Sequence, residues 1–295
     1  MQIIDCFGPP KARGHAHGEM LRDQIRDALE AWENATMAAL GVCAPKNMDA
    51  YCAKFIADTT LIERARAATP SLYAEMAGIA EGADQPLERI AAYNLMDEQW
   101  WYDAPAESPP PGCSLIAAPI AGGHVLAQNM DLPEHMTGSQ VALRLAGPDM
   151  PQTVVLSAAG LIGLTGANDA GLAIGVNTLL MLHHARNGLP VAFAMRHALA
   201  AMDGADAQAR LAGVGHASGQ HYAMVTQRGI RSVECSATSC VPYPVPDDGI
   251  LLHTNHPLIS DEIDGAAQAR LDSAGFNKSS TTRLEWLKNQ RERCR

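Results

Sequence analysis

The chain has 295 residues, 47% of them hydrophobic, which is enough to bury a large core as one big domain or two smaller ones. Its formal net charge of −10 argues against nucleic acid as a partner, because phosphate binding needs clustered Lys and Arg. No apolar run is long enough to span a bilayer and the start carries no secretion leader, so we expect a cytoplasmic protein without a membrane partner. The seven cysteines are odd in number and irregularly spaced, which predicts reduced thiols.

The first third of the chain is predicted to be helical. Apolar residues recur at helical spacing over residues 17–40, and the same pattern continues beyond them, broken at Pro70 and at Gly82. A further helix opens at Pro86, which suits a first-turn position. The stretch PAESPPPG at 105–112 excludes a helix and predicts a stiff, extended connector.

After Gly112 the pattern changes to that of strands. The segments CSLIAAPI and HVLAQNMD flank a glycine turn and predict a hairpin, and three more strand-like runs follow: QVALRLA, QTVVLSAA and GLAIGVNTL. Next come a helix at about 191–202, a second hairpin within 219–237, a strand within 249–258, and a last helix at 279–293 with a Ser or Thr N-cap. This order of elements predicts an α+β protein with layered sheets.

Cys113 stands at the start of the first of these strands, directly behind Gly112. Most free cysteines are small buried core residues, and this position fits that interpretation. The alternative is a nucleophile, because a thiol is the most reactive side chain near neutral pH. If its sulfur attacked the Gly112 carbonyl, the peptide could rearrange to a thioester and hydrolyse. Cys113 would then gain an α-amine, whose reference pKa of about 7.7–8.0 suits a base at physiological pH.

The glycine favours such a step. Because Gly112 lacks a side chain, it can adopt a strained backbone and lets another group approach its carbonyl closely.

Four short motifs follow one another along the chain: GCS at 112–114, AQNMD at 127–131, GANDAGLAIGVN at 166–177 and HTNHP at 253–257. Together with ARGHAHGEMLRDQI near the start, this set resembles the N-terminal-nucleophile (Ntn) hydrolases. It is most similar to the peptidase C45 branch, the acyl-coenzyme A:6-aminopenicillanic acid acyltransferase-like proteins, with the choloylglycine hydrolases as cousins. The resemblance extends, with gaps, over nearly the whole chain.

The resemblance implies a four-layer αββα fold of the α+β class, made as one precursor. Cleavage at Gly112–Cys113 would give a mostly helical α-chain, 1–112, and a β-chain, 113–295, which together form a single structural domain. Cys113 matches the family nucleophile. Asp131 matches the aspartate that orients the new α-amine, and Asn255 matches the asparagine whose amide donates to the oxyanion.

Two further positions match the choloylglycine cousins. Asn177 stands where they place a second asparagine in the site, and Arg283 in SSTTRLEWL resembles their active-site arginine. Each partner of Cys113 also has a structural alternative. Asp131 and Asn255 would suit turns, and Arg283 would suit a solvated helix surface.

The sequence departs from the cousins in two ways. Three residues before Asp131 they carry an arginine where this chain has Gln128, so bile-salt chemistry is not implied. The chain also ends soon after the Arg283 helix, whereas family members continue through further strands, so we expect either a short protein or one truncated at its C-terminus.

Other features weigh less. Histidines cluster at 15–17 and 183–184, but no HExxH motif occurs and the spacing of Cys235 and Cys240 is not that of a metal site, so no metal is expected. The aromatic residues at 100–102 suit core packing, with the wall of an acyl pocket as the alternative.

The function expected first is a self-processing cysteine amidohydrolase that cleaves a small N-acyl amide through a thioester. The alternative is N-acyl transfer from a thioester donor such as acyl-CoA, and neither reaction needs a cofactor. Two other classes are weighed: an uncleaved, inactive homologue that acts as a binding module, and a metal-dependent hydrolase. The partner is a small molecule, and whether the chain forms a homo-oligomer is left open.

Overall fold

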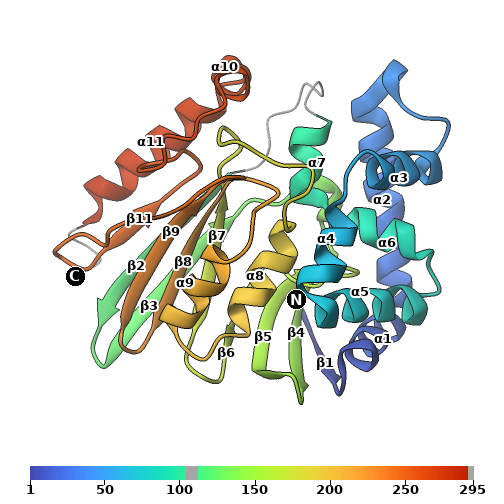
Figure 1. Cartoon of the computed structure of the whole chain (residues 1–295), viewed down its shortest axis with the longest axis horizontal. Coiled ribbons are helices and arrows are strands. Elements are labelled where there is room, and N and C mark those ends of the chain that lie inside the picture. Colours follow the sequence, from blue (N-terminus) through green and yellow to red (C-terminus); the bar gives the residue numbers. More distant parts are fainter. Residues whose placement is uncertain (104–111, 292–295) are drawn as a thin grey trace.

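Two sheets organise the computed structural model, which describes residues 1–103 and 112–291. Within these residues the strands form an eight-stranded sheet of order β1-β4-β5-β6-β7-β8-β9-β10 and a three-stranded sheet of order β11-β2-β3 (Figure 1). The large sheet contains β1 (Gln2–Phe7), β4 (Gln140–Gly147), β5 (Met150–Ala158), β6 (Thr165–Asn168), β7 (Ala173–Thr178), β8 (Gln220–Thr226), β9 (Gly229–Cys235) and β10 (Cys240–Pro242). The small sheet contains β2 (Cys113–Ile120), β3 (Gly123–Met130) and β11 (Leu251–His253). The protein is therefore a mixed α+β structure with a large sheet, as the element order predicts.

The main core lies between the large sheet and most of the helices. Figure 1 shows α8 and α9 across the sheet and the N-terminal helices beside them. These helices are α1 (Pro10–Met20), α2 (Arg22–Leu40), α3 (Met48–Ala57), α4 (Leu61–Ala68), α5 (Pro70–Ala83), α6 (Leu87–Tyr93), α7 (Met96–Tyr102), α8 (Val191–Leu199) and α9 (Gly204–Ala212). Among the helices of the described residues, none is both long and apolar enough for a membrane span.

Strand β2 of the small sheet is packed on both faces. Leu115 and Ala117 of β2 pack with Ala223 and Val225 of β8 in the large sheet. Ala118, on the opposite face of β2, packs instead with Leu284 and Leu287 of α11 (Phe276–Asn289), the helix that follows α10 (Gly265–Ser273). Because successive side chains of a strand point to opposite faces, a strand buried on both sides is a continuous apolar run, which explains LIAA at 115–118.

Helices α1 and α5 pack unusually closely. A Cβ atom added to Gly14 or Gly18 of α1 would meet backbone atoms of α5 at 1.8 and 2.2 Å, and one added to Gly78 or Gly82 of α5 would meet α1 backbone at 2.2 Å. The break expected at Gly82 falls one residue before the end of α5 at Ala83, and the glycine also lets two helix backbones touch.

Several other boundaries differ from the sequence prediction. The helix expected after Pro86 is two helices, α6 and α7. The last helix begins at Phe276 with Gly275 as N-cap, so the predicted Ser or Thr cap is wrong. Strand β1, which pairs in parallel with β4, and the helices α9 and α10 were not predicted. The expected connector lies outside the described residues except for Gly112.

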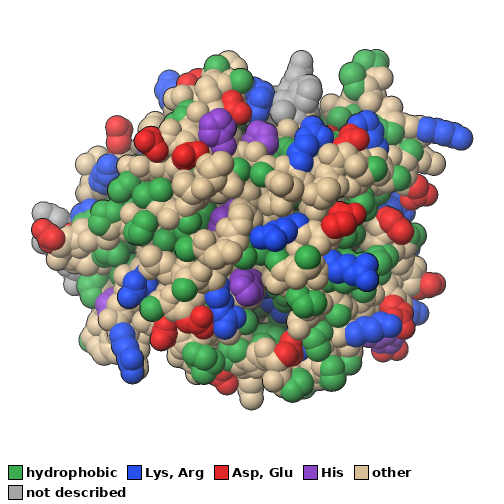
Figure 2. All heavy atoms as spheres, viewed as in Figure 1, with side chains coloured by type: hydrophobic (Ala, Val, Ile, Leu, Met, Phe, Trp, Pro, Cys, Tyr) green, Lys and Arg blue, Asp and Glu red, His purple; other side chains and the backbone are tan. Residues whose placement is uncertain are grey.

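The distribution of charged side chains can be followed on one face of the molecule. On the face seen in Figure 2, basic and acidic side chains are interspersed rather than gathered into one basic patch.

Candidate active site

The β2–β3 hairpin sets the positions of Cys113 and Asp131. Cys113 opens β2 and pairs with Met130 at the end of β3. The register continues one step further, because the Asp131 N–H donates to the Gly112 carbonyl oxygen at 3.1 Å. The spacing of 18 residues between Cys113 and Asp131 is thus the length of the hairpin, and it places Asp131 opposite the Gly112–Cys113 peptide.

Gly112 is required by a close approach. A Cβ atom there would lie 2.6 Å from Nη2 and 3.0 Å from Cζ of Arg283, and 3.4 Å from Oδ1 of Asn255. The guanidinium could not simply move aside, since its other contacts hold it. This is the close approach to Gly112 that the sequence suggests.

Asn255 contacts the Cys113 nitrogen. The Cys113 N–H donates to Oδ1 of Asn255 at 2.6 Å, and Nη2 of Arg283 donates to the same oxygen at 2.9 Å. The Asn255 amide nitrogen donates to the Thr178 carbonyl at 3.1 Å. Two donors on one side and an acceptor on the other fix the orientation of the amide. Its oxygen, rather than its nitrogen, faces Cys113 in the intact chain.

Helix α11 contributes two side chains one turn apart. Arg283 donates to the Cys113 carbonyl oxygen, and to Oγ of Ser114 at 3.0 Å, so it lies in the site and not on a solvated surface. Ser280 is fully buried and accepts the backbone N–H of Asn255 at 2.8 Å. Sequence reasoning missed Ser280, because a serine within a helix carries no signal of its own.

Asn177 lies behind the Asn255 loop. Its amide nitrogen donates to the carbonyl oxygens of His253 and Thr254, at 3.2 and 3.0 Å. Both amide hydrogens are thereby occupied by backbone acceptors. The structure places Asn177 as a support of the segment that carries Asn255.

Glu234 supports the same segment from β9 and was also missed. Its fully buried carboxylate accepts the backbone N–H groups of Leu258, Ile259 and Ser260 at 2.7, 3.1 and 2.8 Å, and contacts Nε2 of His253 at 2.8 Å. The sequence carried no signal for it, because in SVEC the glutamate alternates with Val233 and Cys235 and so would be expected on the opposite, solvent-facing side of the strand.

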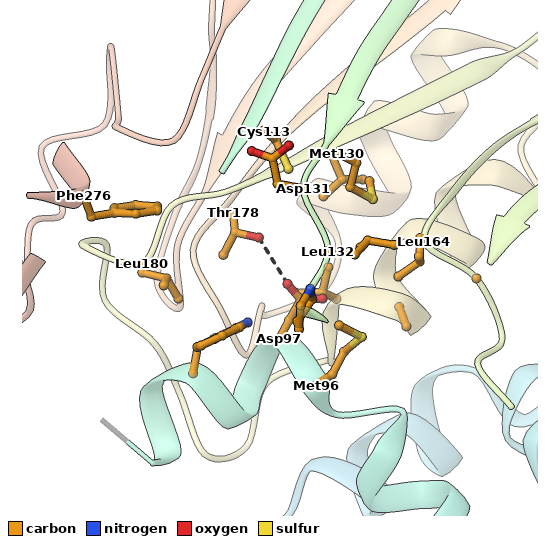
Figure 3. Close-up of a pocket in the computed structure, with 16 residues that line it drawn as sticks. Met96, Asp97, Cys113, Met130, Asp131, Leu132, Leu164, Thr178, Leu180 and Phe276 are labelled. Carbon is orange, nitrogen blue, oxygen red and sulfur yellow. Dashed lines mark hydrogen bonds between the residues drawn. The ribbon is translucent and has the colours of Figure 1, made fainter. Parts of the chain in front are cut away.

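A pocket opens beside Cys113. It encloses about 650 Å³ including its mouth, between α7, the end of β7, the segment after β3, and Phe276 of α11. Figure 3 shows Cys113 and Asp131 at one end and Asp97, hydrogen-bonded by Thr178 at 3.1 Å, facing them across it. Most of the other lining side chains are apolar: Met96, Trp100, Met130, Leu132, Pro133, Leu164, Val176, Leu180, Val191, Ala192 and Phe276. Of the three neighbouring aromatic residues, Trp100 lines this pocket, while Trp101 is buried and donates to Ser218.

The electrostatics of the intact chain disfavour a thiolate. Burial raises the pKa of the Cys113 thiol to about 11, and the negative charges of Asp97 and Asp131 add to this, against the Asp131 N–H and the charge of Arg283. Burial also raises the pKa of Asp97 and that of its neighbour Glu98. Cys113 therefore needs a base before it can act as a nucleophile.

The α+β architecture, with a cysteine at the head of a strand beside a mainly apolar pocket, is compatible with the Ntn class of hydrolases and acyltransferases. The model of the family described as acyl-coenzyme A:6-aminopenicillanic acid acyl-transferase matches residues 121–294, more than half of the chain, and the chain belongs to this family. It is also 27% identical over 262 residues to the acyl-coenzyme A:6-aminopenicillanic-acid-acyltransferase 40 kDa form of Emericella nidulans, covering 88% of this chain and 70% of that protein.

The resemblance seen in the motifs is thereby confirmed, and it implies acyltransferase or hydrolase activity of the Ntn type. The matched residues include Asp131, Asn177, Asn255 and Arg283, whereas Gly112 and Cys113 lie just before them.

Proposed function

We propose that the chain is a precursor that cleaves itself between Gly112 and Cys113 and then hydrolyses a small N-acyl amide through a thioester on Cys113. One observation carries this assignment: the groups around the peptide bond are all held by site residues. The Gly112 oxygen meets the Asp131 N–H, the Cys113 nitrogen meets Asn255, and the Cys113 carbonyl meets Arg283.

In the self-cleavage step the Cys113 sulfur attacks the Gly112 carbonyl carbon. Negative charge develops on the Gly112 oxygen, where the Asp131 N–H is already 3.1 Å away. The C–N bond breaks, and its nitrogen takes up the proton that the thiol loses and becomes the α-amine, still facing Asn255. Water then attacks the resulting thioester, which frees the Gly112 carboxylate and restores the thiol.

In turnover the new α-amine is the base that the buried thiol lacks. It takes the thiol proton, the sulfur attacks the acyl carbonyl, and the leaving amine is protonated as the acyl group passes to sulfur. Water then hydrolyses the thioester. We assign the Asp131 carboxylate to orienting the amine. Arg283 holds the carbonyl of Cys113.

Asn255 has two roles in this scheme. Its oxygen holds the Cys113 nitrogen before and after cleavage. Donation to an oxyanion requires its amide nitrogen to leave the Thr178 carbonyl when substrate binds, while Asn177 keeps the supporting segment in place.

The pocket supports an acyl group of modest size. Its lining is mainly apolar, with Phe276 and Leu180 along one wall (Figure 3), so burial of an apolar acyl chain would provide most of the binding free energy. The proposed location is the cytoplasm, since the cysteines of the described residues are free, as in a reducing compartment.

We also propose that the three packing contacts of the fold form the four-layer αββα arrangement of Ntn hydrolases. Helices lie on the large sheet, the large sheet lies on the small sheet, and α11 lies on the outer face of the small sheet.

The second candidate is acyl transfer to an amine, with acyl-CoA as the donor. The name of the Emericella nidulans relative is that of an acyltransferase using acyl-coenzyme A, and both reactions pass through the same thioester. They differ only in what attacks it. Incubating purified protein with an acyl-CoA and an amine, and separately with the N-acyl amine in water, separates transfer from hydrolysis by mass spectrometry of the products.

The first test is the intact mass of wild-type protein beside Cys113→Ala. We expect wild type to separate into pieces 1–112 and 113–295 under denaturing conditions and the variant to stay whole. A wild-type chain that stays whole and turns over neither substrate would make the binding module the correct assignment.

A further inference from the structure

A second cluster of reactive side chains lies outside the pocket, at the β10 edge of the large sheet. Cys235 ends β9 and Cys240 begins β10, directly opposite each other in the antiparallel register, with their sulfur atoms 2.8 Å apart. His216, in the segment between α9 and β8, joins them. One imidazole nitrogen of His216 and the two sulfurs all lie within 4.8 Å of one another.

His216 is held in the orientation of a ligand. The side chain is 2% exposed, and its Nε2 lies 2.9 Å from the carbonyl oxygen of Leu211. A neutral ring must therefore carry its proton on Nε2. That leaves the lone pair on Nδ1, which is buried without a hydrogen-bond partner among the described residues. A backbone carbonyl that fixes one ring nitrogen so that the other can bind a metal is the usual support of metal-ligating histidines.

Other polar atoms nearby also lack partners. Gln220 of β8 pairs with Cys235 across the sheet and so lies on the same face, and it is fully buried. Neither its side-chain oxygen nor its nitrogen has a hydrogen-bond partner within the described part of the chain, and the same holds for the hydroxyl of Tyr222, whose ring is 5.7 Å from that of His216. Buried polar groups are nearly always paired, so several unpaired ones beside two thiols indicate something missing from the protein atoms alone.

We propose that Cys235, Cys240 and His216 bind a zinc ion. Two thiolates and one imidazole are a zinc donor set, with zinc–sulfur bonds of about 2.3 Å and a zinc–nitrogen bond of about 2.0–2.1 Å. In that geometry the sulfurs stand about 3.8 Å apart, so the two side chains rotate apart by about 1 Å when the ion enters. Each thiol gives up its proton on binding, and a water completes the tetrahedron, to which Gln220 offers its unpaired atoms.

The role of this ion is structural. None of its three ligands lines the pocket at Cys113. Along the sheet, Cys235 lies two strands from Thr178 through Gln220, about 10 Å at ordinary strand spacing. Zinc would fasten β10, an edge strand of three residues, to the segment that precedes β8.

The test measures metal rather than activity. Full-length protein purified with zinc supplied should contain about one zinc per chain, and replacing zinc with Co²⁺ should give the strong sulfur-to-cobalt absorption of thiolate ligands. Cys240→Ser and His216→Gln should lower the zinc content at least about tenfold. Cys43→Ser, an exposed cysteine elsewhere, is the matched control and should keep it.

Two results would overturn the zinc site. Wild-type protein free of metal, with two fewer titratable thiols than its seven cysteines under denaturing, non-reducing conditions, would mean a Cys235–Cys240 disulfide. Metal-free protein with every thiol titratable would mean a simple thiol pair. The cobalt absorption is measured on folded wild-type protein, so this test holds even if the variants fail to fold. Cys113→Ala should keep its zinc, so failure of self-cleavage and failure of zinc binding are seen separately.

Discussion

As the proposed nucleophile, Cys113 would be weak until its proton has an acceptor. With the pKa of its thiol raised to about 11 by burial, only about one chain in ten thousand carries the thiolate at pH 7. The intact chain has no amine at this point, because the Cys113 nitrogen is an amide that donates to Asn255. Cleavage would convert that amide into a base without moving it. The proposed activation therefore changes only this nitrogen, from an amide to an amine, and the side chains that contact it are already in place.

Gly112→Ala adds one methyl group beside this peptide and tests whether the positions of the surrounding side chains matter. The added Cβ would lie 2.6 Å from the Arg283 guanidinium, so the variant must displace Arg283 or the carbonyl that Cys113 attacks. Because a displacement of about 1 Å can cost about a hundredfold in rate, we expect self-cleavage to slow by that order. The cleaved fraction over time, followed by intact mass, measures it.

Gly265→Ala is the matched control, since a Cβ there meets nothing within 4 Å, and it should cleave as wild type does. Cleavage of Gly112→Ala at the wild-type rate would contradict the tight packing of Arg283 against this peptide.

At this scale the sequence indicates the residues next to the Gly112–Cys113 bond better than those behind them. Gly112, Cys113 and Asp131 are readable because one hairpin joins them, and its length is visible in the sequence. Glu234 and Ser280 are not, because each acts through backbone groups of a segment remote in the chain, and only the folded structure brings these together. The proximity of His216 to Cys235 and Cys240 could not be predicted for the same reason, since it joins segments that are remote in the chain.

At the scale of elements, three neighbouring strands support the Asn255 segment. Asn177 of β7, His221 of β8 and Glu234 of β9 pair side by side across the large sheet, and so project from the same face. The His221 ring stacks on that of His253 with centroids 3.6 Å apart. The carboxylate of Glu234 is the charged member of this row. Burial alone would raise its pKa, but His253 and the backbone N–H groups outweigh burial and lower it.

Glu234→Gln should therefore destabilise the protein by about 1.5–3 kcal/mol at pH 7, the usual contribution of hydrogen bonds to a charged group. A carboxyl group with a lowered folded-state pKa adds stability above its unfolded pKa, about 4.3, and loses it as pH falls through the folded value. The difference in unfolding free energy between wild type and variant should thus disappear below about pH 4. Urea unfolding across this pH range measures it, with both proteins in the Cys113→Ala background so that the chain stays whole.

Glu285→Gln, on the exposed side of α11, is the control and should change stability little. If the difference in unfolding free energy between wild type and Glu234→Gln stays constant down to pH 3, the charge of Glu234 does not hold the Asn255 segment.

Prediction of the elements succeeded where the pattern is local. Both hairpins were predicted from two strand-like runs separated by a short turn, and the structure contains both. The missed elements are short or depend on distant partners. Strand β1 is stable only beside β4, which lies far along the chain, and α10 has little apolar periodicity but an N-cap, Asp264, whose carboxylate accepts two backbone N–H groups. The close contact at Gly82 was not predicted, because glycine marks both helix ends and close helix contacts.

At the scale of the whole molecule, the proposed cleavage would leave two chains that must stay together. Strand β1 from the first piece adds to the edge of a sheet built by the second. Glu75 of α5 lies between Arg13 of the first piece and Arg196 of the second, with oxygen–nitrogen distances of 3.0 and 2.9 Å. All three side chains are at most 3% exposed, and Arg13 continues to Asp149 at 2.6 Å. This buried network joins the two pieces through their core.

Glu75→Gln should consequently cost about 3–5 kcal/mol of unfolding free energy, because the buried Arg196 guanidinium loses the carboxylate that compensates its charge and Arg13 keeps only that of Asp149. The measurement belongs in the Cys113→Ala background, where the chain stays whole and unfolding does not depend on protein concentration. Glu81→Gln, on the same helix but in an exposed pair with Lys11, is the matched control and should change the unfolding free energy little. If the two variants lose the same unfolding free energy, the network does not hold the pieces together. Cleaved wild type should then separate on a sizing column instead of eluting as one species.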